Sequence, residues 1–190
     1  MKTFLIAFLF FSVATAQTSY TLEIFVNGEP VAWTLLADQQ EGEARDDAFT
    51  TDRDAVTVLF DGGKLDLNLA DWGVFDYAHV LGTEFTKTAA DTYTVSATVR
   101  HDDKGWNDYA DAFEVKGEQA ENGLRELLHP HDDEQPFTRS QSDVRASGEV
   151  WLEAKTNVVG LGGSKIYLDL SGFSDLDEFS VSYEVVQKED

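Results

Sequence analysis

The chain has 190 residues, of which 36 are acidic and 14 are basic, so its formal net charge at pH 7 is −22. This charge argues against nucleic acids and anionic membrane surfaces as partners, because both attract Lys and Arg. It favours cations or basic protein partners. The chain has no Cys, so disulfide bonds and a cysteine nucleophile are excluded and stability must come from a buried core.

Residues 1–16 have the features of a signal peptide. Lys2 supplies the positive charge, Phe4–Val13 is an apolar run too short to span a bilayer, and Ala14–Ala16 fits the cleavage pattern of small residues. The alternative is a buried N-terminal strand or helix. No later run approaches the length of a membrane span, so we expect an exported protein, periplasmic or secreted, that begins at Gln17.

Residues 17–88 are predicted to form an N-terminal β region. Asn27–Gly28 separates two runs rich in β-forming residues, Tyr20–Val26 and Pro30–Leu36, which is a strong signal for a hairpin. The next stretch, Ala37–Arg53, is polar and lacks periodicity, so we expect a mobile loop there.

A second hairpin is predicted around Asp61–Gly63. Leu65, Leu67 and Leu69 alternate with polar residues, so the second strand of this hairpin should have one buried face and one face exposed to solvent. The aromatic stretch Ala70–Leu81 follows, and its side chains are expected to pack rather than to bind a ligand. Its histidine, His79, is isolated in the sequence and is interpreted as a packing or surface residue.

Residues 89–170 are predicted to form an antiparallel β-sandwich, and residues 171–190 a C-terminal strand. Within Thr92–His101 apolar residues alternate with polar ones, as in a half-buried strand. A further strand is expected within Trp106–Val115, and others at Leu124–Leu128, Phe137–Val144, Glu149–Ala154, Lys165–Leu170 and Glu178–Val186. Short strands separated by turn signals are typical of antiparallel sandwiches, so the whole chain is predicted to be all-β, with the N-terminal hairpin region added to the sandwich.

The segment His129-Pro130-His131-Asp132 is the strongest candidate for a chemical site. A residue before proline favours extended geometry, and alternate residues of an extended segment point to the same side. The imidazoles of His129 and His131 can therefore project together, followed by the Asp132 carboxylate. These donors suit Zn(II) or Cu(II). The alternative is a solvated loop whose histidines bind only backbone groups.

His101 is the candidate third histidine ligand, because it ends a predicted strand just before a turn. If the sandwich brings its loops to one pole, His101, His129 and His131 would supply three nitrogens, with Asp132 as a further ligand. The alternative is an ordinary polar residue at the end of a strand. A calcium site built from the nearby acids is also conceivable, but the Asp-x-Asp-x-Asp-Gly spacing of an EF-hand is missing.

Two long motifs carry a resemblance. The runs Val99–Val115, with Gly-Trp-Asn-Asp-Tyr-Ala-Asp, and Leu127–Ser140, with Leu-Leu-His-Pro-His-Asp-Asp-Glu-Gln-Pro-Phe-Thr-Arg-Ser, resemble a family of small exported bacterial proteins of unassigned function. The resemblance implies an immunoglobulin-like sandwich and an exported location. Members of the family often carry a histidine in the later glycine-rich turn. Here that turn, Asn157–Gly163, has none, which weakens a histidine ligand from that loop.

Three functions are consistent with the sequence. The first is a non-enzymatic protein that binds a transition-metal ion, Cu or Zn, through the His-Pro-His segment. The second is a structural or interaction module without a ligand. The third is a carbohydrate-binding or hydrolytic protein that uses its aromatic and acidic residues, although the Gly-x-Ser-x-Gly pattern of many hydrolases is missing.

Overall fold

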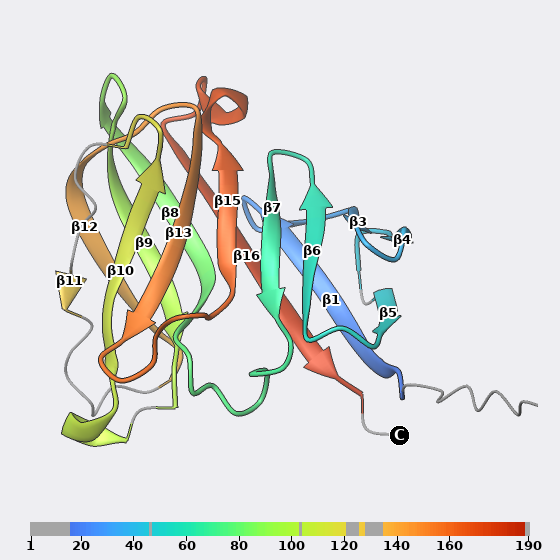
Figure 1. Ribbon diagram of the computed structural model, residues 1–190. Helices are drawn as coiled ribbons and strands as arrows, with labels where there is room; N and C mark the ends of the chain where they lie inside the picture. The colour runs from blue at the N-terminus through green and yellow to red at the C-terminus, as the bar shows by residue number, and fades with distance from the viewer. Residues whose placement is uncertain (1–15, 46, 103, 121–125, 128–134, 189–190) are drawn as a thin grey trace, which may run out of the picture.

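Two antiparallel sheets lie face to face in the protein (Figure 1). The computed structural model describes residues 16–45, 47–102, 104–120, 126–127 and 135–188. Two short 3-10 helices, η1 (Gly105–Asn107) and η2 (Leu170–Phe173), are the helical elements of these residues. The prediction of an all-β antiparallel sandwich is confirmed.

The first sheet has seven strands in the described part of the chain. Their order is β12 (Phe137–Arg145), β9 (Thr92–Arg100), β8 (His79–Ala89), β16 (Glu178–Gln187), β1 (Thr18–Val26) and β2 (Glu29–Val31), and β5 (Asp47–Thr51) also pairs with β1. The C-terminal strand β16 lies between β1 and β8, so it joins the N-terminal hairpin to the rest of the sheet. The strand predicted at residues 137–144 is confirmed as β12, which lies at an edge of this sheet.

The second sheet has nine strands, again counting only what the structure describes. Their order is β11 (Glu126–Leu127), β10 (Ala110–Gly117), β13 (Glu149–Thr156), β15 (Lys165–Asp169), β7 (Gly63–Asn68), β6 (Ala55–Phe60), β3 (Trp33–Leu35) and β4 (Gln40–Gly42), and β14 (Gly160–Leu161) pairs with β13. The boundary expected between the two predicted regions, at residues 88–89, falls in β8, and both sheets take strands from both sides of it.

The Asn27–Gly28 hairpin is confirmed, with one correction to its second strand. Asn27 and Gly28 have φ values of 53° and 78°, the left-handed conformation that a tight turn between twisted strands requires. The second strand does not continue to Leu36: after β2 the chain crosses at Ala32 into the other sheet as β3. The crossing buries Trp33, whose indole nitrogen donates to the carbonyl of Leu22 at 3.3 Å.

The mobile loop predicted at Ala37–Arg53 is wrong, because two strands, β4 and β5, occupy much of it. The side-chain amide of Gln40 donates to the carbonyl of Thr50 at 2.8 Å and accepts from its backbone nitrogen at 3.1 Å. These bonds join an edge of one sheet to an edge of the other. Phe49 in β5 is buried against Tyr20, with ring centroids 5.4 Å apart. One buried aromatic and side-chain hydrogen bonds therefore order a stretch that lacks a hydrophobic pattern.

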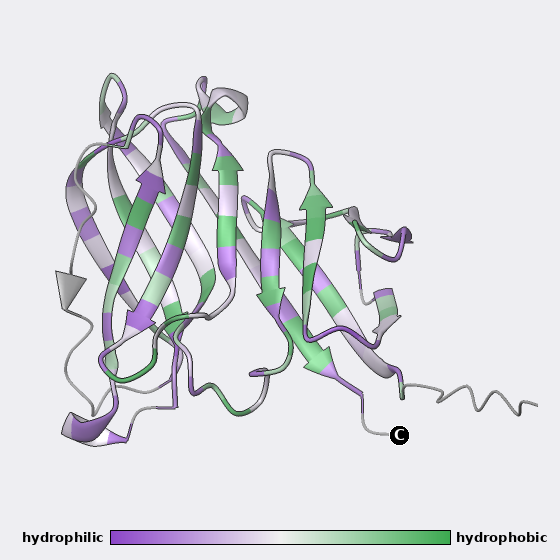
Figure 2. Cartoon of the chain, viewed as in Figure 1, coloured by the Kyte–Doolittle hydropathy of each residue, from purple (hydrophilic) through white to green (hydrophobic). Residues whose placement is uncertain are grey.

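The core lies between the sheets, and hydrophobic and hydrophilic residues alternate along strands such as β10 and β13 (Figure 2). The alternation predicted for residues 92–101 is confirmed, since Tyr93 and every second residue up to Val99 are buried. At one end of the core, Phe173 and Phe85 stack on opposite sides of Phe179, with centroid separations of 4.3 and 5.0 Å. The β6–β7 hairpin around Asp61–Gly62 is also confirmed.

Candidate functional site

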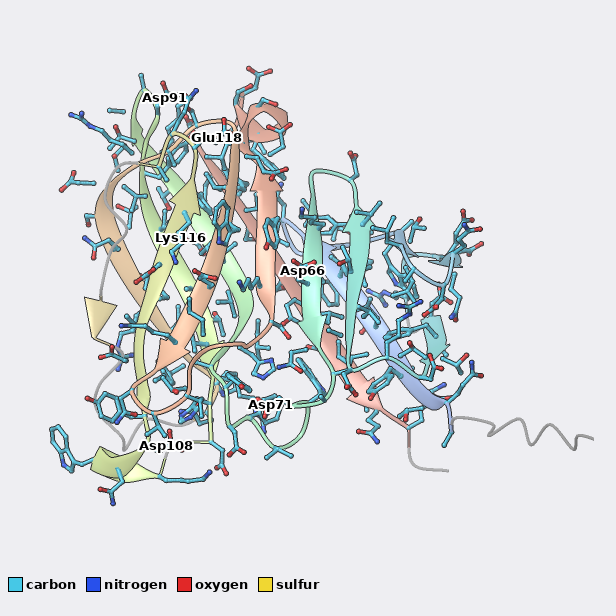
Figure 3. The ribbon with its side chains drawn as sticks, in the orientation of Figure 1. Asp66, Asp71, Asp91, Asp108, Lys116 and Glu118 are labelled. Carbon is cyan, nitrogen blue, oxygen red and sulfur yellow. The ribbon has the colours of Figure 1, made fainter. Side chains whose placement is uncertain are left out.

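Three connections meet at the end of the sandwich where Asp71 and Asp108 lie (Figure 3). They are the loop after β7, the segment from β9 to β10 that contains η1, and the turn after β13. The backbone nitrogen of Asp102 donates to the carbonyl of Phe75 at 2.9 Å, and that of Tyr109 donates to Asn157 Oδ1 at 2.7 Å. These bonds hold the three connections together as one pole, called here the histidine pole.

His101 follows β9 and lies inside the histidine pole, with 1% of its surface exposed. Its backbone nitrogen donates to Gln135 Oε1 at 3.1 Å, so the residue is fixed to the chain just before β12. Its Nε2 lies 3.5 Å from Asp108 Oδ1. Within the described residues, both ring nitrogens and this carboxylate oxygen are buried and have no hydrogen bond.

The separation of 3.5 Å between Nε2 and Oδ1 is long for a hydrogen bond but matches two ligands of one metal ion. With a Zn–N bond near 2.05 Å, a Zn–O bond near 2.1 Å and a tetrahedral angle, two ligand atoms lie about 3.4 Å apart. The distance between these two atoms is therefore compatible with a shared Zn(II) ion as well as with a direct His–carboxylate ion pair.

Lys104 lies beside the Asp108 carboxylate, near the oxygen that does not face His101. Its ammonium nitrogen lies 2.8 Å from Asp76 Oδ1 and 3.7 Å from Asp108 Oδ2. The backbone nitrogen of Lys104 also donates to the carbonyl of Asp108 at 2.8 Å. Lys104 thus orients Asp108 and leaves its other oxygen, Oδ1, directed to the His101 side.

The structure describes only one of the four predicted metal ligands. His129, His131 and Asp132 lie outside the described residues, whereas His101 is described and lies beside Asp108. No group of three or more His, Cys, Asp or Glu side chains that could hold a metal ion occurs among the residues described. His101 and Asp108 would therefore form half of a four-ligand site, and the other ligands would have to come from elsewhere.

A second buried histidine, His79, forms a complete network that the sequence did not reveal. Its Nε2 lies 2.8 Å from Asp71 Oδ2, and its Nδ1 lies 2.9 Å from Ser164 Oγ. The backbone nitrogen of Ser164 donates to Nδ1 at 3.2 Å, so Nδ1 accepts and Nε2 carries the proton that is donated to Asp71. The imidazole is fully buried, as is the serine, at 0% and 1% exposure.

The trio of Asp71, His79 and Ser164 has the residue types of a hydrolase triad but a different arrangement. In such a triad the carboxylate binds Nδ1 and the serine binds Nε2, whereas here the two nitrogens are exchanged. Ser164 Oγ also accepts the backbone nitrogen of Asn68 at 3.0 Å and is closed off from solvent. The trio therefore links β7, the loop after it and the segment before β15, and it acts as a structural clasp.

Asp71 is the centre of this clasp, because one carboxylate organises a whole loop. Its Oδ1 accepts the backbone nitrogen of Asp76 at 3.1 Å, and its Oδ2 accepts that of Tyr77 at 2.8 Å. The rings of Trp72 and Phe75 lie edge-on to the His79 imidazole, with centroids 5.6 and 5.3 Å away. The expectation that the aromatic stretch Ala70–Leu81 packs is confirmed.

We expect the free energy of unfolding to fall as the pH drops below 6.5, because burial lowers the pKa of His79 from its ordinary value of 6.5. The hydrogen bond that His79 donates to Asp71 opposes this shift, and the charges of His101 and Arg100 add to it. The unfolded chain then binds a proton that the folded chain does not, so stability present above pH 6.5 is lost toward lower pH. Urea unfolding at pH 7.5 and 5.5 measures the loss.

The control for this pH dependence is His79→Gln, which keeps a polar side chain but cannot titrate. The variant is expected to lose less stability between pH 7.5 and 5.5 than the wild type does. Equal losses in the two proteins would show that His79 does not cause the dependence.

Comparisons with known proteins give no family for the chain. No family model matches it, and neither a curated protein nor a solved structure is significantly similar to it. In the part of the chain that the structure describes, there is no helix of the length and apolar character needed to cross a membrane.

Proposed function

We propose that this chain is an exported, non-enzymatic β-sandwich protein that binds one transition-metal ion, Zn(II) or Cu(II), at the histidine pole. His101 and Asp108 would be two of its ligands, and His129 and His131 would complete the shell. The single observation that supports this most is the buried His101 imidazole: within the described residues neither of its nitrogens has a hydrogen bond, and Nε2 lies 3.5 Å from Asp108 Oδ1, which has none either.

Burying polar atoms without hydrogen bonds costs folding free energy. The buried His101 nitrogens and Asp108 Oδ1 would therefore be stabilised by a bound ligand. A buried polar group without a hydrogen bond costs about 1–3 kcal/mol. Nε2 and Oδ1 have only their long contact with each other, and Nδ1 has no hydrogen bond in the described part of the chain. A metal ion would satisfy Nε2 and Oδ1 at once, at the separation of 3.5 Å that they already have. Backbone contacts of His101 and the ion pair of Asp108 with Lys104 would keep both donors in place.

The His-Pro-His segment supports the proposal through chain connectivity. His131 precedes Gln135 by four residues, and Gln135 binds the backbone of His101. Four residues span at most about 14 Å, so the covalent chain allows the imidazole of His131 to reach His101. His129 shares its side of the chain with His131 if Pro130 keeps the segment extended. Three imidazoles and one carboxylate would then form a four-ligand shell, with Asp132 as an alternative oxygen ligand.

Calorimetric titration of the mature protein, residues 17–190, with Zn(II) and Cu(II) tests the proposal. We expect one ion to bind per chain, and the double variant His129→Ala/His131→Ala to bind at least roughly 100-fold more weakly. The matched control is Asp133→Asn/Glu134→Gln, which changes the same segment and should bind nearly as the wild type does.

Asp108→Asn provides the second arm, because it keeps the shape of a half-buried side chain and removes its charge. We expect this variant to weaken binding by about 10- to 100-fold. If the wild type binds neither ion, or if the histidine variants bind as tightly as the wild type, the proposed metal function is wrong.

A further inference from the structure

The outer face of the nine-stranded sheet carries a pair of aromatic side chains that do not belong to the core. Trp151 in β13 lies directly opposite Tyr167 in β15, and their rings stack with centroids 5.8 Å apart and planes inclined by 25°. Their strand neighbours Val150, Leu152 and Ile166 are fully buried, so the two rings point away from the core. Both remain partly exposed to solvent.

A pocket lies beside Trp151, on the side away from the histidine pole. Its volume is about 250 Å³, and it lies where β10 ends and the turn from β12 to β13 passes. Figure 3 places Glu118 at this end of the sandwich and Asp108 at the other. The lining residues are Glu118, Gln119, Ser147, Gly148, Glu149 and Trp151.

The pocket is lined by one aromatic side chain and by several hydrogen-bonding groups. Glu118 and Glu149 supply carboxylate oxygens, and the Ser147 hydroxyl donates to the Gln119 side-chain oxygen, which fixes the amide and leaves its nitrogen to donate. A small-molecule site typically has an aromatic surface and a few placed polar groups. A sugar ring needs this combination, because its C–H face lies against the negative face of an aromatic ring while its hydroxyls form hydrogen bonds.

The charge at the pocket selects among sugars. Two carboxylates line it, and no Lys or Arg does among the residues described. The nearest strand cation in register with Trp151 is Lys116, which is engaged by Glu114 at 2.9 Å and by Glu153. Uronic acids and sulfated sugars would therefore meet repulsion from both the pocket and the net charge of −22. The hydroxyl groups of neutral sugars could instead donate hydrogen bonds to these carboxylates.

We infer that the pocket beside Trp151 binds a neutral pyranose unit of a polysaccharide, with the Trp151 ring as its stacking surface and Glu118, Glu149 and Gln119 as hydrogen-bonding groups. Tyr167 supports the ring of Trp151 from the next strand. This site is separate from the histidine pole, so it does not depend on a metal ion.

Affinity electrophoresis of the mature protein with EDTA tests the inference. Native gels contain glucomannan, xylan, laminarin, hydroxyethylcellulose or, as the acidic probe, alginate. We expect at least one neutral polysaccharide to retard the protein and alginate not to do so. Trp151→Ala should weaken this retardation about ten-fold. The matched control is Trp106→Ala, because Trp106 is also a tryptophan but lies at the histidine pole, where it is 76% exposed. This variant should leave the retardation unchanged.

A second variant keeps the test decisive if Trp151→Ala does not fold. Glu118→Gln changes an exposed side chain at the rim and should also weaken retardation. The inference is overturned if no neutral polysaccharide retards the wild type, if alginate retards it equally, or if Trp106→Ala loses as much as the pocket variants. Trp151→Ala and Glu118→Gln should bind zinc as the wild type does in a calorimetric titration. The outcome for the polysaccharide site is therefore independent of the proposed metal function.

Discussion

Asp71→Ala is expected to lower the free energy of unfolding by about 4 kcal/mol. The substitution removes the acceptor of two backbone nitrogens, those of Asp76 and Tyr77, and of the buried His79 imidazole. The His79 imidazole is buried and the two backbone donors are partly buried, and a buried donor left without a partner costs about 1–3 kcal/mol. Chemical denaturation at pH 7.5, analysed by linear extrapolation, measures the change.

The control for this variant is Asp76→Ala in the same loop. The Asp76 side chain is half exposed, and its carboxylate pairs with Lys104 at the surface, so its removal should cost less than about 1 kcal/mol. The backbone nitrogen of residue 76 keeps its bond to Asp71 in this variant. If the two variants are destabilised equally, the clasp of Asp71, His79 and Ser164 does not stabilise the loop as we describe.

Phe85→Ala is expected to destabilise the protein by a similar amount, about 4 kcal/mol, through loss of core packing. Phe85 is fully buried, stacks on Phe179 and meets the edge of Tyr93 at a centroid distance of 5.6 Å. The surrounding side chains come from two sheet strands and cannot close fully on the cavity. The midpoint of urea unfolding gives the measurement.

Leu59→Ala is the matched control for Phe85→Ala, because Leu59 is also apolar but lies on the outer face of β6 with 38% of its surface exposed. Leu59→Ala should lower the free energy of unfolding by less than about 1 kcal/mol, as most surface substitutions do. A Phe85 variant no less stable than the Leu59 variant would contradict the described core.

The sequence predicted those strands whose hydrophobic residues alternate and whose turns use Asn or Gly. The hairpins at Asn27–Gly28 and Asp61–Gly62 and the strand 92–100 are of this kind, because local chemistry alone determines them. The strands β4 and β5 escaped prediction because Gln40 and Phe49 obtain their partners from distant strands. The crossing at Ala32 was missed for a related reason: residues on both sides of it favour strands, and only tertiary packing decides which sheet each joins.

The metal site stays a prediction. His101 was identified from its position at the end of a strand, and the structure adds Asp108 as its neighbour, seven residues later. The clasp around His79 could not be predicted, because Ser164 lies 85 positions from His79 and reaches it through the pairing of β15 with β7. A lone histidine in an aromatic stretch has no sequence signal that distinguishes a clasp from simple packing.

The most direct test of the metal proposal is the ring nitrogen spectrum of the four histidines in ¹⁵N-labelled protein, recorded by NMR with and without one equivalent of Zn(II). The account predicts that the ring signals of His101, His129 and His131 shift together, while those of His79, held by Asp71 and Ser164, stay in place. An unchanged His101 ring in the presence of Zn(II) would contradict it, whether or not zinc binds elsewhere on the chain.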